Sequence, residues 1–260
     1  MRQWKKIIGI CLGLLILIAG LFLLHVNRLY VVPIMMYHHV EDLDHHEANW
    51  VSPKNFEFQM AFLKKHRYHV ISLEKLVEIT RNNEIPRWKT VVITFDDGYV
   101  DNYTEAVPIL KKYGFPAIFF LPVNRMGTPG HMSWNQVREL AGDGFAIGSH
   151  GLEGRYLLDF SREKQIREIK NSRRNLENRL GQTIDYFAYP IGGFSDFIKS
   201  IVAQSGYQGA CATNRGFDRF NKDVFELNRI RFSNQDSQTI ILWAKLSGFY
   251  NFFRKNKKPY

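Results

Sequence analysis

Short apolar runs alternate with helix-like segments along most of the chain, and this alternation restricts the possible fold more than any other feature. The runs Thr90–Ile93 and Ala117–Leu121 are rich in β-branched or aromatic residues, which is typical of strands buried in a sheet. Residues 161–180 instead repeat their apolar side chains at helical spacing. Strands separated by helices in this way favour a mostly parallel sheet covered by helices, so we predict an α/β fold.

Polar residues directly follow several of the predicted strands. They are His38, Asp96, Asp97, His150 and Tyr189. In a (β/α) barrel the carboxyl ends of the strands carry the active site. We therefore expect these residues to share one edge of the sheet.

Two adjacent carboxylates, Asp96 and Asp97, stand where one of these strands ends, and Gly98 follows them. Neighbouring side chains on a strand point to opposite faces, so the two acids either diverge or are both drawn toward a cation or a shared proton. The alternative is an Asp-Asp-Gly turn that only closes the strand. The other motifs of the chain decide between these interpretations.

Residues 7–24 form a continuous apolar run that is preceded by Arg2, Lys5 and Lys6. A helix of this length spans roughly 27 Å, close to a membrane hydrocarbon core of about 30 Å. The basic residues follow the positive-inside rule, which places the N-terminus in the cytoplasm and the rest of the chain outside. A cleaved signal peptide is the alternative, but no small-residue cleavage site follows the run. We therefore predict an uncleaved membrane anchor.

The chain of 260 residues is thus expected to have five parts. They are a cytoplasmic basic segment (1–6), a transmembrane anchor (7–24), a short linker (25–30), one globular domain (31–246) and a basic tail (247–260). The net charge of +10 suits a polyanionic cell wall or an anionic membrane surface. We predict no nucleic-acid partner, because the sequence has no zinc-finger spacing and no long basic run before the tail. Cys11 and Cys211 lie too far apart in the predicted organisation to form a disulfide, and the oligomeric state stays open.

Three motifs in order carry a family resemblance. They are Thr94–Gly98, then Gly148–His150, then Phe187–Pro190 with Gly192. Together they resemble the polysaccharide deacetylases of carbohydrate esterase family 4, also called the NodB-homology domain. The resemblance covers residues 31–245 and implies a distorted (β/α) barrel of NodB type.

Two further segments resemble one branch of that family. The opening Met36–His38 and the closing Leu227–Ile230 are similar to the enzymes that deacetylate poly-β-1,6-N-acetylglucosamine of biofilms. The resemblance implies an N-deacetylase that acts on acetamide groups of an N-acetylglucosamine-containing polymer, and the predicted anchor would hold this enzyme at the membrane, outside the cell.

The resemblance also implies roles for individual residues. A divalent metal, usually zinc, polarises the acetamide carbonyl and binds the attacking water in this family. Asp97 and His150 match metal ligands, Asp96 matches the general base, and His38 matches the general acid of the biofilm branch. The backbone after the Tyr189-Pro190 pair, near Ile191, matches the oxyanion-binding position.

One family feature is missing from the sequence. A second ligand histidine is expected four or five residues after His150, where this chain has Gly154 and Arg155. A catalytic zinc normally has three protein ligands. Glu153 is one candidate replacement, and Arg155 could instead place a positive charge where the metal would lie.

Other features keep two interpretations open. Trp134 is either a platform for sugar stacking or part of the core, and His39 is interpreted as a surface or supporting residue. The alternative function is a catalytically impaired relative that binds glycan or supports the assembly of a wall polymer.

Overall fold

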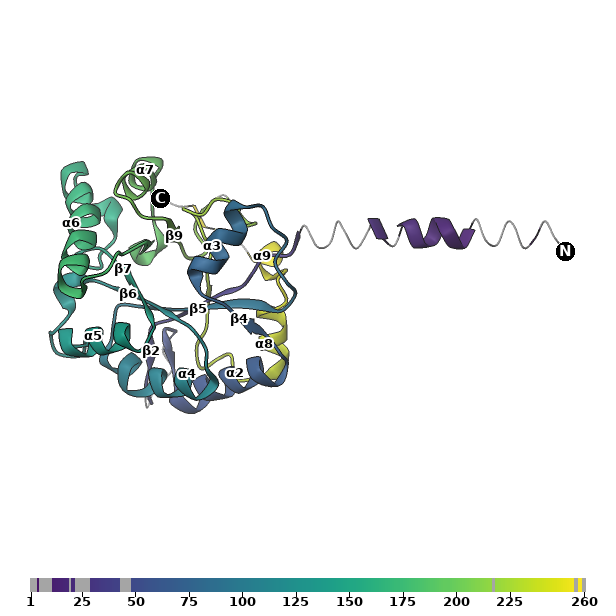
Figure 1. Cartoon of the computed structure of the whole chain (residues 1–260), viewed down its shortest axis with the longest axis horizontal. Coiled ribbons are helices and arrows are strands. Elements are labelled where there is room, and N and C mark those ends of the chain that lie inside the picture. Colours follow the sequence, from purple (N-terminus) through teal and green to yellow (C-terminus); the bar gives the residue numbers. More distant parts are fainter. Residues whose placement is uncertain are drawn as a thin grey trace.

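A sheet of parallel strands organises the structure (Figure 1), a computed structural model that describes residues 4, 11–18, 20–21, 29–42, 48–216, 218–254 and 257–258. The strand order is β10-β1-β5-β6-β7-β8-β9, and β4 pairs with β5. The strands are β1 (Ile34–Tyr37), β4 (His69–Val70), β5 (Thr90–Asp96), β6 (Ile118–Leu121), β7 (Ala146–Ser149), β8 (Tyr186–Ala188), β9 (Gly209–Cys211) and β10 (Ile230–Arg231). The predicted parallel α/β architecture is therefore confirmed as a half-barrel.

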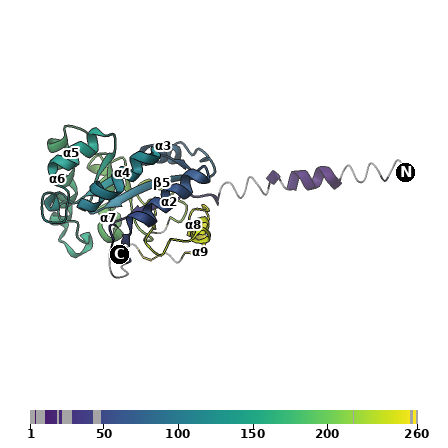
Figure 2. The same cartoon turned by 90° about the horizontal axis from the view of Figure 1, so that it is seen from below.

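Helices surround this sheet, as Figures 1 and 2 show. They are α2 (Pro53–Lys65), α3 (Leu73–Arg81), α4 (Val107–Tyr113), α5 (Trp134–Gly142), α6 (Arg162–Leu180), α7 (Asp196–Gln204), α8 (Thr239–Lys245) and α9 (Tyr250–Phe253). Five of them begin after a serine whose hydroxyl accepts a backbone N–H of the first turn, which satisfies a donor that the helix leaves free. Every residue of β5 is buried because helices cover the sheet.

The segment Leu227–Arg231 connects the two edges of the half-barrel. Leu227 forms a parallel bridge with Cys211 beside β9, and Ile230 pairs with Met35 of β1. Arg229 lies between these two contacts, and its side chain is fully buried. This short crossing therefore brings a cation into the interior of the sheet.

A small pair of strands was not predicted. β2 (His39–Val40) pairs in parallel with β3 (Trp50–Val51). Several of the other strands are followed by short helical turns, which are η1 (Asn102–Ala106), η2 (Val123–Arg125), η3 (Leu157–Asp159) and η4 (Pro190–Gly192). His39 therefore belongs to a strand and not to an exposed loop.

Of the predicted anchor 7–24 and linker 25–30, the structure describes residues 11–18, 20–21 and 29–30. Among the residues that are described, no helix is both long and apolar enough to cross a membrane. The anchor and the five-part organisation remain predictions.

Candidate active site

A cavity of about 610 Å³ opens at the carboxyl ends of the central strands. Five predicted site residues line it together: His38, Asp96, Asp97, His150 and Ile191. His38 follows β1, Asp96 ends β5 and His150 follows β7. The sequence places these side chains up to 153 positions apart, and the parallel register brings them to one edge.

Asp96 forms a bidentate ion pair with Arg229. Nη1 of Arg229 lies 2.6 Å from Oδ1 of Asp96, and Nη2 lies 2.7 Å from Oδ2. Burial by itself would raise the pKa of Asp96, but the Arg229 guanidinium, together with His150 and His38, outweighs this effect and holds the pKa below its ordinary value. Asp96 is therefore a buried carboxylate that stays ionised.

Arg229 is the functional residue that sequence reasoning missed. Its Nε donates to the carbonyl of Ala212 and its Nη1 also donates to Thr94, so three contacts fix its plane against Asp96. Its only sequence signal was its place inside the Leu227–Ile230 motif, which does not reveal that the side chain is buried.

Asp97 and His150 face each other across the cavity floor. Nδ1 of His150 lies 2.9 Å from the carbonyl of Ala188. A carbonyl only accepts, so Nδ1 carries the proton and Nε2 keeps a free lone pair. That nitrogen lies 3.7 Å from Oδ1 of Asp97. This is the tautomer and orientation of a metal-binding histidine held by an outer hydrogen bond, so the pair fits two coordination positions of a divalent cation.

His38 lies beside these carboxylates with an unsatisfied ring nitrogen. Its Nδ1 is buried and has no hydrogen-bond partner in the part of the chain that the structure describes, while its backbone carbonyl accepts from Asn102. Burial lowers the pKa of His38, and the attraction of Asp96 and Asp97 only partly offsets this effect. A substrate group that can accept or donate at Nδ1 would satisfy this atom.

Gly154, which has only backbone atoms, lies where the missing ligand histidine was expected. Gly154 lines the cavity with φ of +66°, and a Cβ at this residue would lie 2.9 Å from Cβ of Pro122. The two candidates for this position, Glu153 and Arg155, are not among the residues that line the cavity. Glu153 pairs with Lys164 at 2.8 Å, and Arg155 is largely exposed and lies 3.6 Å from Glu153.

We expect Gly154→Ala to lower the free energy of unfolding by about 1–3 kcal/mol more than Gly181→Ala does. Gly181 has φ of +67° but nothing within 4 Å of a built Cβ, so both variants share the backbone strain and only the first adds a clash with Pro122. Chemical denaturation followed by circular dichroism measures both. Equal losses would show that Pro122 moves aside freely.

Two predicted residues lie away from the cavity. The side chain of Trp134 packs partly buried against the core, with the Arg179 guanidinium 4.3 Å above its ring. Tyr189 is fully buried and its hydroxyl donates to the carbonyl of Phe225 at 3.0 Å. Of the Tyr189 and Ile191 pair only Ile191, with φ of +60°, reaches the cavity. Tyr189 thus supports the strand end from the core.

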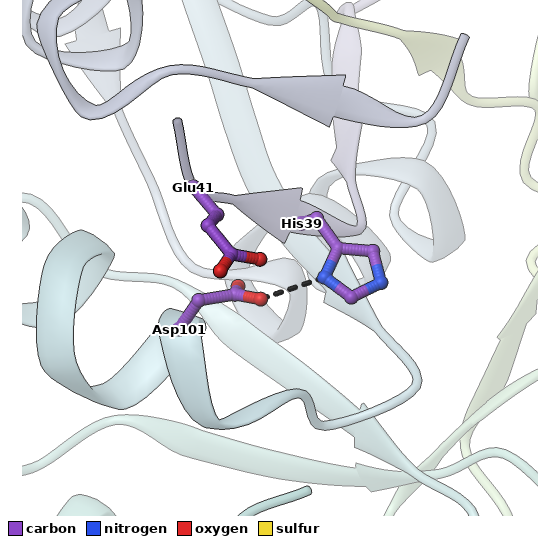
Figure 3. A group of neighbouring side chains, drawn as sticks. All are labelled: His39, Glu41 and Asp101. Carbon is purple, nitrogen blue, oxygen red and sulfur yellow. Dashed lines mark hydrogen bonds and ion pairs between the residues drawn. The ribbon is translucent and has the colours of Figure 1, made fainter. Parts of the chain in front are cut away.

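A second group of side chains, shown in Figure 3, lies next to the site. Ligand atoms of His39, Glu41 and Asp101 lie within 4.8 Å of one another, the one such group of three that the described part of the chain contains. Oδ2 of Asp101 is 2.6 Å from Nδ1 of His39, and Oδ1 accepts from the N–H of Val40 at 2.9 Å. Its oxygens are therefore already engaged, and they hold β2 in place behind His38.

Comparisons with known proteins agree with this geometry. The sequence profile described as polysaccharide deacetylase matches residues 83–210. A Bacillus subtilis (strain 168) protein, YxkH, whose name assigns it to the polysaccharide deacetylases, is 30% identical over 78% of this chain and 71% of its own length. A poly-β-1,6-N-acetyl-D-glucosamine N-deacetylase of Staphylococcus epidermidis is 26% identical over 74% of this chain and 71% of its own length. The solved structure of the Streptococcus pyogenes deacetylase PplD is similar with a TM-score of 0.76 and 30% identity, covering 83% of this chain and 97% of that one.

Proposed function

We propose, because this chain belongs to the polysaccharide deacetylase family, that it removes N-acetyl groups from a polymer that contains N-acetylglucosamine. Members of this family are hydrolases of amide bonds that generally depend on a divalent metal. The observation that carries the proposal is the ionised Asp96, held by Arg229, beside the Asp97 and His150 pair in one cavity.

Asp96 serves as the general base. Arg229 occupies one lone pair on each carboxylate oxygen, so each oxygen keeps another lone pair for the proton of an attacking water. Arg229 also prevents Asp96 from taking a proton before the reaction, because it stabilises the charged form. The bidentate contact fixes the carboxylate plane, and positioning of this kind is a main source of rate enhancement.

His38 provides the proton for the departing sugar amine. Its buried Nδ1 has no hydrogen-bond partner among the described residues, and burial lowers its pKa while the carboxylates of Asp96 and Asp97 partly offset this effect. Its carbonyl is held by Asn102, whose side chain also contacts Asp101. The backbone at Ile191, which also lines the cavity, is the proposed oxyanion contact.

Asp97 and His150 would hold the divalent ion, which we propose to be zinc. Bound there, the ion would polarise the acetamide carbonyl and acidify water. With Gly154 at the third position, this chain supplies two ligands where catalytic zinc sites normally have three. The affinity of the site for the ion is therefore expected to be lower than that of a site with three protein ligands.

We also propose that the domain acts outside the cell and is held at the membrane by residues 7–24. Support comes from the length of this apolar run and from Arg2, Lys5 and Lys6 before it. A polymer of the cell wall or of a biofilm is the substrate that such an anchored domain would meet.

Acetate release tests the proposed function. Purified protein is incubated with chitooligosaccharides, poly-β-1,6-N-acetylglucosamine and peptidoglycan, with zinc or another divalent metal added. We expect acetate from at least one polymer, and loss of this activity on addition of a chelator. No acetate from any polymer with any metal would overturn the proposal.

A second candidate is a relative that binds glycan without turnover. The observation that favours it is Gly154, which has no side chain to offer at the third ligand position. Glycan binding that a chelator does not change, together with no acetate release, would support this candidate.

A further inference from the structure

The cavity that holds the proposed active site is strongly cationic. Besides Arg229, it is lined by five basic side chains: Arg215, Arg231, Lys245, Arg254 and Lys257. Asp96 and Asp97 are its two carboxylates, and Asp96 is already paired with Arg229. The lining of the cavity therefore carries an excess of positive charge.

Among the residues that the structure describes, four of these cations have no carboxylate partner. Lys245 pairs with Asp236 at 2.6 Å, but Arg215, Arg231, Arg254 and Lys257 form no ion pair with any residue that the structure describes. Like charges gathered in one cavity repel each other, and an anion would relieve this repulsion.

Arg254 is the most informative of the four. Its Nη1 donates to the carbonyl of Arg229 at 2.7 Å. Its Nε and Nη2, which form one edge of the guanidinium, are buried and have no hydrogen-bond partner in the described structure. Burial lowers the pKa of Arg254 to about 10, and the opposing influence comes from Tyr250 and not from a carboxylate. Leaving buried donors unpaired is costly, so a ligand that fills this edge would be bound with a clear gain.

Arg254 lies close to the ion pair of Asp96 and Arg229. Through the Arg229 carbonyl it contacts the backbone of the residue that holds Asp96. Lys257 and Arg215 lie beside each other, since residues 215 and 257 form a parallel bridge at the cavity wall. A sugar whose acetamide lies over Asp97 and His150 would thus have its neighbouring groups directed at basic side chains.

We propose that the substrate carries an oxyanion, a phosphate or carboxylate, next to the acetamido sugar, and that Arg254 binds it through its free Nε–Nη2 edge. A planar fork of two N–H groups matches two oxygens of one phosphate or carboxylate. Lys257 and Arg215 add charge around the same group. This inference rests on the proposed deacetylase function and narrows its substrate to an anionic glycan.

Two measurements on the full-length protein test the inference. Calorimetric titration with N-acetylglucosamine phosphate, with N-acetylmuramic acid and with neutral N-acetylglucosamine measures anion binding independently of turnover. Acetate release from a neutral and a phosphate-bearing oligosaccharide of equal length measures the consequence for catalysis. Comparison of the phosphate and carboxylate sugars identifies which oxyanion the cavity prefers.

Wild-type protein is expected to bind at least one anionic sugar about tenfold more tightly than the neutral sugar. Arg254→Gln should remove most of this preference, and Arg254→Lys should restore only part of it because lysine keeps the charge but loses the fork. Arg174→Gln is the matched control, since Arg174 is an exposed arginine of α6 that is not among the residues lining the cavity, and it should keep the full preference.

The possible failures are distinguishable. Equal binding of anionic and neutral sugars by the wild type, or an unchanged preference in a folded Arg254→Gln protein, would overturn the inference while leaving deacetylation of neutral polymers intact. Anion binding through Arg254 without acetate release from any glycan would instead overturn the proposed function and support the anion site.

Discussion

Replacement of Arg229 by methionine is expected to lower the free energy of unfolding at pH 7 by about 3–5 kcal/mol, because it leaves the Asp96 carboxylate buried without its partner. The pair is fully enclosed, with Nη1 to Oδ1 at 2.6 Å and Nη2 to Oδ2 at 2.7 Å. Methionine fills much of the volume, so the loss reports on charge more than on packing. Activity is expected to fall as well, since Asp96 would no longer be held ionised.

The pH dependence of this loss identifies its cause. Arg229 depresses the pKa of Asp96 in the folded protein, so the pair contributes stability that is present above the ordinary carboxyl pKa of about 4 and is lost as the pH falls through the lower folded value. The cost of Arg229→Met should therefore shrink in acid, where Asp96 takes up a proton. Denaturant unfolding between pH 3 and pH 8 measures this trend.

Two further variants complete the experiment. Arg231→Met is the matched control, because Arg231 is exposed and its guanidinium lies 3.3 Å from Asn49 without an ion pair among the described residues. It should cost less than about 0.5 kcal/mol. The double variant Asp96→Asn with Arg229→Met should be more stable than Arg229→Met alone. A pH-independent loss for Arg229→Met would contradict the buried ion pair.

The second large effect is expected for Asp97→Asn, which should weaken zinc binding and acetate release on the order of a hundredfold or more. Asparagine keeps the shape of the side chain but loses the charge that a metal ligand supplies. Asp97 has φ of +69°, and asparagine tolerates this left-handed conformation better than most residues. Stability should therefore change little, which separates this result from that of Arg229→Met.

Zinc titration and acetate assays on the same preparations measure both losses. Asp159→Asn is the control, because Asp159 is an exposed carboxylate that does not line the cavity. It should bind zinc and release acetate like the wild type. Unchanged zinc affinity in Asp97→Asn would place the metal elsewhere, and the group of His39, Glu41 and Asp101 would be the next position to examine.

The sequence predicted that His38, Asp96 and His150 would lie together, because strand ends in a parallel sheet share one edge. His38, Asp96 and His150 each follow an apolar run, and apolar runs are the part of a sequence that most directly reports buried strands. The motifs therefore identified the cavity residues without knowledge of which strands are neighbours.

The same reasoning could not predict that Arg229 is buried against Asp96. Its partner Asp96 is 133 positions away, and nothing in the local pattern separates a buried arginine from one at the surface. The pairing depends on the crossing segment between β9 and β1, which is too short to stand out in the sequence.

Side-chain direction near the ends of elements was the other limit. Glu153 and Arg155 follow His150 closely, yet their side chains turn toward Lys164 and toward each other. Tyr189 and Ile191 are two positions apart, but the turn η4 sends one into the core and the other to the cavity. Such choices depend on backbone turns that periodicity does not describe.

The central claim is tested most directly by counting acetate and free amine released from one N-acetylated oligosaccharide by the wild type and by Asp96→Asn, with zinc added. Circular dichroism first establishes a temperature at which both proteins are folded. We predict equal amounts of acetate and amine from the wild type, and a rate about 10²–10⁴-fold lower for Asp96→Asn. Release at the wild-type rate by a folded Asp96→Asn protein, or no release by the wild type, would contradict the account.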